Sequence, residues 1–295
     1  MSSLRQRTIR TTATVSGPLL HASGSGTVVF SPAPEDTGWV FIRSDLPGNP
    51  QIPCRPENVD VRYRWTTVRR GEASVSVVEH VLAACRGLEI DNLLISVDTD
   101  GIPMPDGGSA KPFVDALLDA RIICQAKPRN FFIIDRPVFV AGSRGDPMTE
   151  KIASSQSYIV TLPGNGFEVI YVLEYPNTPL GTQIVKFDVN PDVFVREIAP
   201  ARSFITSWEL NRLQNEQATA LFGPAIDEVP IVHPNRNFVQ RLSLEAARHK
   251  ALDLVGDLAL LGRPIQGTFI GIRSGHRLNR ELVLSLAHQF EEANL

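Results

Sequence analysis

The sequence predicts an α+β protein of two similar domains, each a β-sheet packed against helices, which together form a duplicated β-α-α-β sandwich. Two observations support this fold class. In each half of the chain, short β-rich runs are followed by a helix, a glycine, a strand, a loop and a second helix. The first of these helices carries a histidine in each half, His80 and then His249. An insert in each domain completes the expected architecture.

The length, charge and composition of the chain exclude several classes of protein. The 295 residues suffice for two domains that each bury a core. The 29 basic and 32 acidic residues form no basic block, so we expect no nucleic-acid partner. The polar amino end and the absence of a long apolar run predict a soluble, cytoplasmic protein without stable membrane insertion. The scattered cysteines Cys54, Cys85 and Cys124 fit a reducing compartment.

The first elements follow from turn residues and from apolar periodicity. The β-rich runs 26–30 and 39–42 are separated by a turn rich in proline and acidic residues, which predicts antiparallel strands. Apolar residues at helical spacing then predict a helix over 76–86. Gly87 is expected to end this helix in a C-terminal capping role.

A buried strand over 92–97 and an amphipathic helix from 112 to about 120 complete the first half. The polar, proline-bearing segment 125–130 comes next, and new strands begin directly after it. We place the domain boundary in this segment. Domain I, with a small β insert, then covers residues 1–127 and domain II covers 128–295.

Domain II is expected to repeat this order. Its strands are predicted over residues 131–140, 158–162, 168–175 and 183–187. A helix with a Ser243 cap follows and ends at Gly262, before a strand over 267–272 and a last helix over about 280–292. The extra stretch at about 205–240 is predicted to be an insert. An insert of this length in a compact domain is typical of a functional loop or lid.

One helix face of domain II carries several titratable groups. His249 and Asp253 are four residues apart, so their side chains project from the same face one turn apart. With a second imidazole they could bind zinc, although the same spacing is also typical of a surface ion pair. Asp257 lies one turn further along this stripe. Lys250 points about a quarter turn away, where it could contact substrate or lie in solvent.

Glu79 has two competing interpretations. Residues 76–79 match a capping box, in which the glutamate bonds back to the start of its helix. Glu79 and His80 also diverge by about 100° around the helix axis, so Glu79 could act as a general base beside a metal bound by His80. His276 lies in a Ser-Gly-His turn. It is either a loop histidine bonded to carbonyl groups or a cation held by a carboxylate such as Asp257.

These residues belong to longer segments that resemble a known family. The segments are Leu20-His21, Val78–Ala84, Ile102–Gly107, Ser109–Phe113, Ala201–Phe204, Arg248–Leu258 and Ser274–Asn279. They span nearly the whole chain and resemble the zinc-dependent UDP-3-O-acyl-N-acetylglucosamine deacetylases of lipid A biosynthesis. The resemblance implies an active site between the domains. It also implies that Zn²⁺ is bound by His80, His249 and Asp253.

The resemblance implies roles for five more residues. Glu79 would be the general base, and His276, with Asp257 as its partner, would be a protonated group that assists the leaving amine. Ser203 stands where the family usually has threonine and keeps a hydroxyl that can stabilise an oxyanion. Lys250 would contact the substrate, an acylated UDP-sugar. The products would be acetate and the free amino sugar, and the usual family member is a monomer.

The sequence departs from the family in the second insert. The family's insert normally carries a glycine-glycine-serine motif beside the passage for the acyl chain, whereas residues 215–226 here have none. The stretch 62–70 is also richer in arginine than expected. Two alternatives therefore stay open. One is a deacetylase of another N-acetylated nucleotide sugar or of an unusual acyl length, and the other is a non-catalytic relative that binds a nucleotide sugar.

Overall fold

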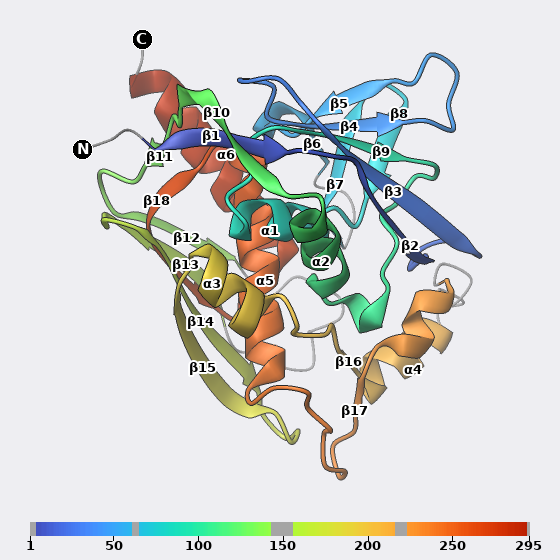
Figure 1. Ribbon diagram of the computed structural model, residues 1–295. Coiled ribbons are helices and arrows are strands. Elements are labelled where there is room, and N and C mark those ends of the chain that lie inside the picture. Colours follow the sequence, from blue (N-terminus) through green and yellow to red (C-terminus); the bar gives the residue numbers. More distant parts are fainter. Residues whose placement is uncertain (1–3, 61–64, 143–155, 216–222, 294–295) are drawn as a thin grey trace.

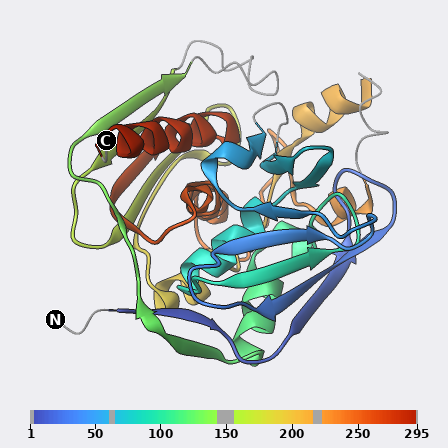
Figure 2. The same cartoon turned by 90° about the horizontal axis from the view of Figure 1, so that it is seen from above.

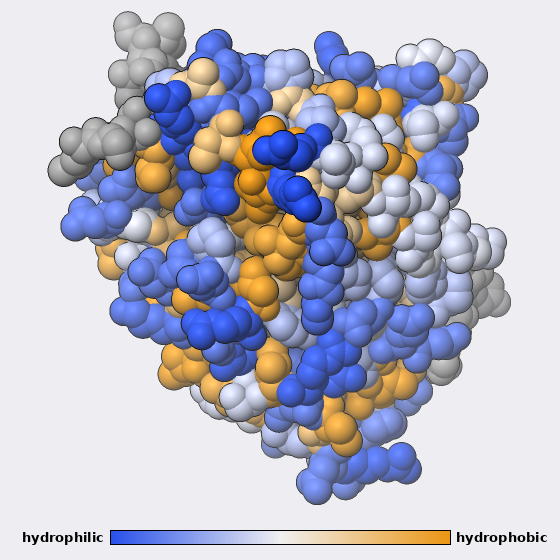
Figure 3. Space-filling model, viewed as in Figure 1, coloured by the Kyte–Doolittle hydropathy of each residue, from blue (hydrophilic) through white to orange (hydrophobic). Residues whose placement is uncertain are grey.

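The computed structural model describes residues 4–60, 65–142, 156–215 and 223–293. Two mixed sheets lie on opposite sides of a layer of helices (Figure 1). The predicted α+β class is confirmed. The face seen in Figure 3 mixes hydrophilic and hydrophobic residues. None of the described helices combines the length and the apolar character needed to cross a membrane.

The first sheet has five strands in the order β2-β3-β9-β4-β5. Their bounds are Ala13–Pro18 for β2, Ser25–Pro32 for β3, Trp39–Arg43 for β4, Gln51–Pro53 for β5 and Leu93–Val97 for β9. Strand β9 lies between β3 and β4, antiparallel to β3 and parallel to β4. The strands expected at 26–30, 39–42 and 92–97 are therefore present. Most neighbouring strands of this sheet are antiparallel, as expected, but β4 and β9 are parallel. Strands β3 and β4 do not pair with each other, because β9 lies between them.

The second sheet repeats the first strand for strand. Its main path is β12-β13-β18-β14-β15, and β11 adds to β18. The bounds are Phe132–Ile133 for β11, Val138–Gly142 for β12, Ser157–Leu162 for β13, Phe167–Tyr175 for β14, Gly181–Asp188 for β15 and Ile265–Ile272 for β18. As in the first sheet, the last strand is antiparallel to the second and parallel to the third. The two halves thus share one topology.

Helices fill the space between the sheets (Figure 2). They are α1 (Glu79–Gly87), α2 (Lys111–Asp119), α5 (Glu245–Leu258) and α6 (His276–Ala293). Helix α2 packs on β2, and α5 packs on β14 and β15. Helix α1 packs directly against α5, so one apolar core runs through both halves. Nearly every residue of α1 and α5 is buried, so most polar side chains of these helices lie inside the protein.

Smaller elements surround this core. They are β1 (Arg5–Ile9), β6 (Val59–Asp60), β7 (Thr67–Arg70), β8 (Ala73–Ser76), β10 (Ile122–Pro128), α3 (Pro191–Val193), β16 (Ile205–Thr206), α4 (Ser207–Asn215) and β17 (Ile231–Val232). Strands β6, β7 and β8 form a small three-stranded sheet, the candidate for the small β insert of domain I (the first insert). Strands β16 and β17 pair with each other beside α4, in the stretch predicted to be the second insert.

Not every boundary follows the sequence prediction. The segment 125–130, expected to be a linker, lies largely in β10, which pairs with β1. The domain limits 1–127 and 128–295 and the insert limits 205–240 stay predictions. Residues 216–222, which make up most of the stretch without a glycine-glycine-serine motif, lie outside the described residues. The same holds for two arginines of the stretch 62–70, Arg62 and Arg64.

Helix α1 begins and ends differently from its prediction. It begins at Glu79 rather than near Ser76, because Ser76 ends β8 and Val77 turns the chain sharply with a φ of 62°. A positive φ at a β-branched residue is rare, so the sequence favours the wrong start. Gly87 lies inside the helix and not at its cap. A Cβ there would come within 2.1 Å of the Phe194 ring, so close packing requires the glycine.

The later helices also differ at their starts. Helix α5 begins at Glu245, and Ser243 does not cap it. Instead the Glu245 amide donates to the side chain of Gln240 at 2.9 Å. The helix is followed by a short 3₁₀ turn and then by Gly262 with a φ of 69°, as expected for its end. Helix α6 begins at His276 and not at Arg280, so His276 is the first residue of a helix.

The three cysteines are free in the structure. Cys54 and Cys85 are buried, and burial raises the pKa of both thiols. Cys124 is exposed. Two of the three are therefore small core residues and the third is a surface residue.

Candidate active site and metal centre

Three candidate ligands meet where α1 packs against α5. His80 comes from α1, and His249 and Asp253 come from α5. One ligand atom of each lies within 4.8 Å of the others, and all three residues are buried. The close approach depends on Gly256 in α5, since a Cβ there would lie 2.1 Å from the backbone oxygen of Glu79. Glycine at this point lets the two helices bring their side chains together.

The chemistry of these donors fits a divalent cation. Nδ1 of His249 lies 3.0 Å from the carbonyl oxygen of Ala201, to which it can donate, so Nε2 is left to bind a metal. Among the described residues, Oδ1 of Asp253 is buried and accepts no hydrogen bond. Leaving a buried carboxylate oxygen without a donor is costly unless a cation occupies the position. The site therefore fits a metal ion bound by two imidazoles and one carboxylate.

Electrostatics hold these ligands in their metal-binding forms. Burial, together with the neighbouring His249, lowers the pKa of His80 to about 3, and burial also lowers the pKa of His249. Burial alone would raise the pKa of Asp253, but Lys250 and the histidines outweigh it and keep the pKa low. Both imidazoles are thus neutral at neutral pH, while the carboxylate is ionised.

Glu79 points into the site and does not cap its helix. Its Oε2 accepts a hydrogen bond from the backbone N–H of Thr66 at 3.2 Å, and Val78 occupies the cap position without a side-chain bond. The capping-box interpretation is therefore wrong. Burial raises the pKa of Glu79 to about 7, helped by Asp257 and Asp253 and opposed by His276. A carboxyl group with this pKa can take up and release a proton at neutral pH.

His276 faces Glu79 from the start of α6. Its Nδ1 lies 2.9 Å from Oδ2 of Asp257, and its Nε2 lies 3.7 Å from both Oε1 of Glu79 and Oδ2 of Asp253. Burial alone would lower the pKa of His276, but these three carboxylates outweigh it and raise the pKa to about 9. The structure thus places the His276 ring against the Asp257 carboxylate rather than against backbone carbonyl groups.

Lys250 and Ser203 lie at the edges of this group. Nζ of Lys250 donates to Oδ2 of Asp253 at 2.9 Å, and Asp253 raises the pKa of the amine despite its burial. The backbone N–H of Ser203 donates to Gly107 at 3.0 Å. A Cβ built on Gly108 would lie 3.1 Å from Ser203 and 3.5 Å from the His80 ring, so these two side chains flank the same glycine.

Sequence reasoning missed two residues of this site. The side-chain amide of Asn279 donates to Oδ2 of Asp257 at 2.8 Å, and the hydroxyl of Thr66 donates to Oδ1 of the same carboxylate. Asn279 lies three residues after His276, which at helical spacing could have indicated it. Thr66 precedes a short strand of the first insert, and no local pattern indicates that it reaches the site.

Comparison with known proteins decides the family. A sequence profile described as UDP-3-O-acyl N-acetylglycosamine deacetylase, LpxC, matches residues 6–288 of this chain. The chain belongs to the LpxC family.

Named relatives of this LpxC-family chain cover it almost completely. A UDP-3-O-acyl-N-acetylglucosamine deacetylase of Bdellovibrio bacteriovorus is 34% identical over 94% of the chain and 88% of its own length. One of Nitratidesulfovibrio vulgaris is 38% identical over 94% of the chain and 85% of its own length. A bifunctional LpxC/FabZ enzyme of Chlorobaculum tepidum is 34% identical, and the chain spans 64% of it.

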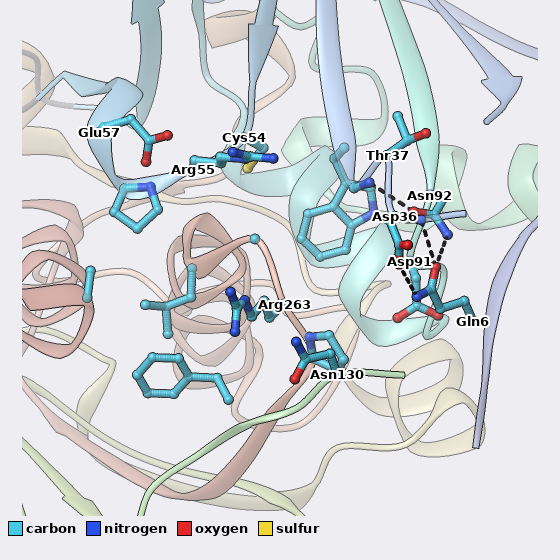
Figure 4. Close-up of a pocket in the computed structure, with 18 of the residues that line it drawn as sticks. Gln6, Asp36, Thr37, Cys54, Arg55, Glu57, Asp91, Asn92, Asn130 and Arg263 are labelled. Carbon is cyan, nitrogen blue, oxygen red and sulfur yellow. Dashed lines mark hydrogen bonds between the residues drawn. The ribbon is translucent and has the colours of Figure 1, made fainter. Parts of the chain in front are cut away.

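A cleft of this LpxC-family chain lies apart from the metal centre. It has a volume of about 760 Å³ and is lined from both halves, by residues that include Arg55, Asn130 and Arg263 (Figure 4). None of the eight site residues expected from the sequence lines it. In Figure 4 Gln6 bonds to both Asp36 and Asn92, so part of its polar lining is satisfied within the protein.

Proposed function

We propose that this protein hydrolyses the N-acetyl group of UDP-3-O-acyl-N-acetylglucosamine in lipid A biosynthesis. The products are acetate and UDP-3-O-acyl-glucosamine. The observation that carries this proposal is the convergence of His80, His249 and Asp253 with Glu79 and His276 in a member of the LpxC family. Relatives that cover nearly the whole chain are named as deacetylases of this substrate.

We infer that the metal is Zn²⁺, with His80, His249 and Asp253 as its ligands. Two neutral imidazoles and one carboxylate form a donor set found in catalytic zinc sites. When bound, the ion supplies Lewis-acid polarisation of a water molecule and of a carbonyl group. Lys250 compensates the charge of Asp253 through its hydrogen bond, which supports the ionised form of this ligand.

Glu79 and His276 are assigned opposite roles in proton transfer. Glu79, with a pKa of about 7, takes a proton from the attacking water and so acts as general base. His276, with a pKa of about 9, is protonated at neutral pH and can donate to the developing oxyanion or to the leaving amine. Asp257 holds the Nδ1 side of this ring, so that Nε2 is the nitrogen that faces Glu79.

Ser203 and Lys250 are assigned to the substrate. Ser203 and the His80 ring flank Gly108, which brings the Ser203 side chain close to a proposed metal ligand, and its hydroxyl is the group that can stabilise an oxyanion. Lys250 is a half-buried cation beside Asp253, and an ammonium group with three N–H donors can bond a substrate oxygen as well as this carboxylate. We further expect the enzyme to be a cytoplasmic monomer that binds no nucleic acid.

The altered second insert favours an alternative substrate within the same chemistry. Because residues 215–226 lack the glycine-glycine-serine motif, the acyl length accepted here can differ from that of the family. A non-catalytic role is disfavoured by the chemistry of the site. Four buried titratable side chains, Glu79, His80, His249 and Asp253, converge there beside His276, and keeping such groups buried is costly without a function.

The deciding experiment combines metal analysis with product identification. Purified protein is expected to contain one zinc per chain and to lose activity on chelation. Mass spectrometry of reactions with UDP-N-acetylglucosamine derivatives that differ in the 3-O-acyl chain should show acetate release that depends on the acyl group. Equal turnover without the acyl group would favour the alternative substrate. Protein that neither holds zinc nor turns over any derivative would exclude both enzymatic functions.

A further inference from the structure

Thr66 lies between the two groups proposed to transfer protons, Glu79 and His276. It is completely buried and lies just before β7, in the first insert. Its backbone N–H donates to Oε2 of Glu79 at 3.2 Å, and its carbonyl oxygen accepts from the N–H of Val78 at 3.2 Å. Both contacts act on the first turn of α1. The backbone of Thr66 therefore orients the proposed base.

The side chain of Thr66 reaches in the other direction, towards domain II. Its hydroxyl donates to Oδ1 of Asp257. The other oxygen of Asp257 is bonded to Nδ1 of His276 at 2.9 Å and to the amide of Asn279 at 2.8 Å. Each oxygen of this buried carboxylate thus has its own donor, and the hydroxyl of Thr66 supplies the one on Oδ1.

A donor on each oxygen determines how the carboxylate is rotated. The Thr66 hydroxyl lies 3.3 Å from Nδ1 of His276, so the two donors are neighbours that must bond different oxygens of Asp257. Because Asp257 holds the imidazole, its rotation sets the direction of Nε2 towards Glu79. Loss of the hydroxyl would leave a buried oxygen unsatisfied and free the carboxylate to rotate.

Thr66 is itself anchored by the second half of the protein. The guanidinium of Arg280, in α6, donates to the carbonyl oxygen of Trp65 at 2.6 Å. The Arg280 residue is 1% exposed, so this bond is sheltered from water. The segment 65–66 is therefore tied to α1, α5 and α6 at once. Because its segment is held at several points, Thr66 can keep the side chains of Glu79 and His276 in fixed positions.

We propose that Thr66 is a positioning residue for the deacetylation reaction, whose backbone orients Glu79 and whose hydroxyl orients His276 through Asp257. This inference rests on the roles proposed above for Glu79 and His276. Thr66 touches neither the proposed metal ligands nor the substrate atoms. Its effect is expected on turnover rather than on metal or substrate binding.

The neighbouring Thr67 offers a matched control. It is also completely buried, and its hydroxyl donates to the Ser76 hydroxyl at 3.1 Å, within the first insert. Thr66→Val and Thr67→Val therefore remove the same group from adjacent buried positions. Only the first of these changes touches the Asp257–His276 pair.

Steady-state kinetics of these variants form the first test. Thr66→Val should lower kcat by roughly 10²-fold, because a small misplacement of a reacting group has this effect. The KM should change by less than about 2-fold and the zinc content should stay at the wild-type value. Thr66→Ser, which keeps the hydroxyl, should restore most of kcat, and Thr67→Val should keep the wild-type kcat. Equal kcat in Thr66→Val and Thr67→Val would overturn the proposal.

A double-variant comparison tests whether Thr66 acts through Asp257. In an Asp257→Ala background, Thr66→Val should lower kcat by less than about 3-fold, because residues that act as one unit are not additive. If Thr66→Val still lowered kcat by roughly 10²-fold in this background, Thr66 would not act through Asp257, and the proposal would be overturned. Where Thr66→Val does not fold, Thr66→Ala removes the same hydroxyl without adding a methyl group and replaces it in every measurement.

Nuclear magnetic resonance of ¹⁵N-histidine-labelled protein gives a reading that needs no turnover. The Nδ1–H proton of His276, assigned by its loss in His276→Gln, should shift in Thr66→Val and stay in place in Thr67→Val and Thr66→Ser. An unchanged signal in Thr66→Val would overturn the proposal. If the wild type has no deacetylase activity, the proposed function fails. The spectra then still decide whether Thr66 holds the Asp257–His276 pair.

Discussion

The two helices that meet at the site contribute to it in different ways. Helix α5 supplies His249, Asp253 and Asp257 from its interior, at intervals of four residues along one face. Helix α1 supplies Glu79 and His80, which are adjacent in its first turn and point in directions about 100° apart. The four-residue spacing on α5 thus places its titratable groups in one row. The two adjacent residues of α1 point in different directions and are assigned different roles, one as base and one as metal ligand. The following predictions test this division.

The largest effect is expected from breaking the row on α5. His249→Ala removes one of three metal ligands, so zinc should be lost during purification and turnover should fall to background. Metal analysis and an acetate-release assay measure both. Arg248→Ala is a suitable control, because Arg248 bonds to Glu197 and not to the site. Retention of stoichiometric zinc in His249→Ala would contradict the ligand assignment.

Changing the base on α1 should separate chemistry from metal binding. Glu79→Gln keeps the shape of the side chain but cannot take up a proton. The value of kcat should fall by roughly 10² to 10⁴-fold, the usual contribution of a general base. Zinc content should stay at the wild-type level, in contrast to His249→Ala. Wild-type turnover in Glu79→Gln would remove Glu79 from the mechanism.

The pH dependence of kcat/KM should report one group from each half of the site. Glu79 must be deprotonated, so activity falls as the pH drops below its pKa of about 7. His276 must be protonated, so activity also falls as the pH rises above its pKa of about 9. A bell-shaped profile follows. His276→Gln should lose the alkaline limb and keep the acidic one, and an unchanged alkaline limb would show that another group titrates there.

The contact between the helices themselves should have the smallest effect. Gly256→Ala places a methyl group 2.1 Å from the Glu79 carbonyl oxygen, so the helices must move apart. Overpacking of this kind typically lowers the free energy of unfolding by about 1–3 kcal/mol. Gly275→Ala is the control, because a Cβ at Gly275 meets no atom within 4 Å. Equal denaturant midpoints for the two variants would show that the helix contact tolerates the added methyl group.

Much of the fold could be predicted from local patterns. The strands over 158–162 and 168–175 and the helix over 112–120 lie within about two residues of their expected positions. These elements carry clear apolar periodicity, which reflects the side that each buries. The sheet order could not be predicted, because β9 enters between β3 and β4 through long-range pairing that leaves no local signal.

Helix starts were the least predictable feature. Ser76 and Ser243 are both good capping residues, yet neither caps its helix. In each case a non-glycine residue with positive φ, Val77 or Leu244, turns the chain into the helix instead. Such a conformation is unfavourable locally and persists only where the surrounding packing compensates for it. For α1 this difference matters, because it directs Glu79 to the site rather than to its own helix.

The sequence by itself determined that His249, Asp253 and Asp257 share one side of a helix, because helical geometry depends only on spacing along the chain. It also determined the repeated order of elements. Only the tertiary structure decided that His80 joins this row, that Glu79 faces His276 and that Thr66 reaches both. These relations join residues far apart in the chain through close helix packing at Gly256 and through buried hydrogen bonds. Local patterns carry no information on such contacts.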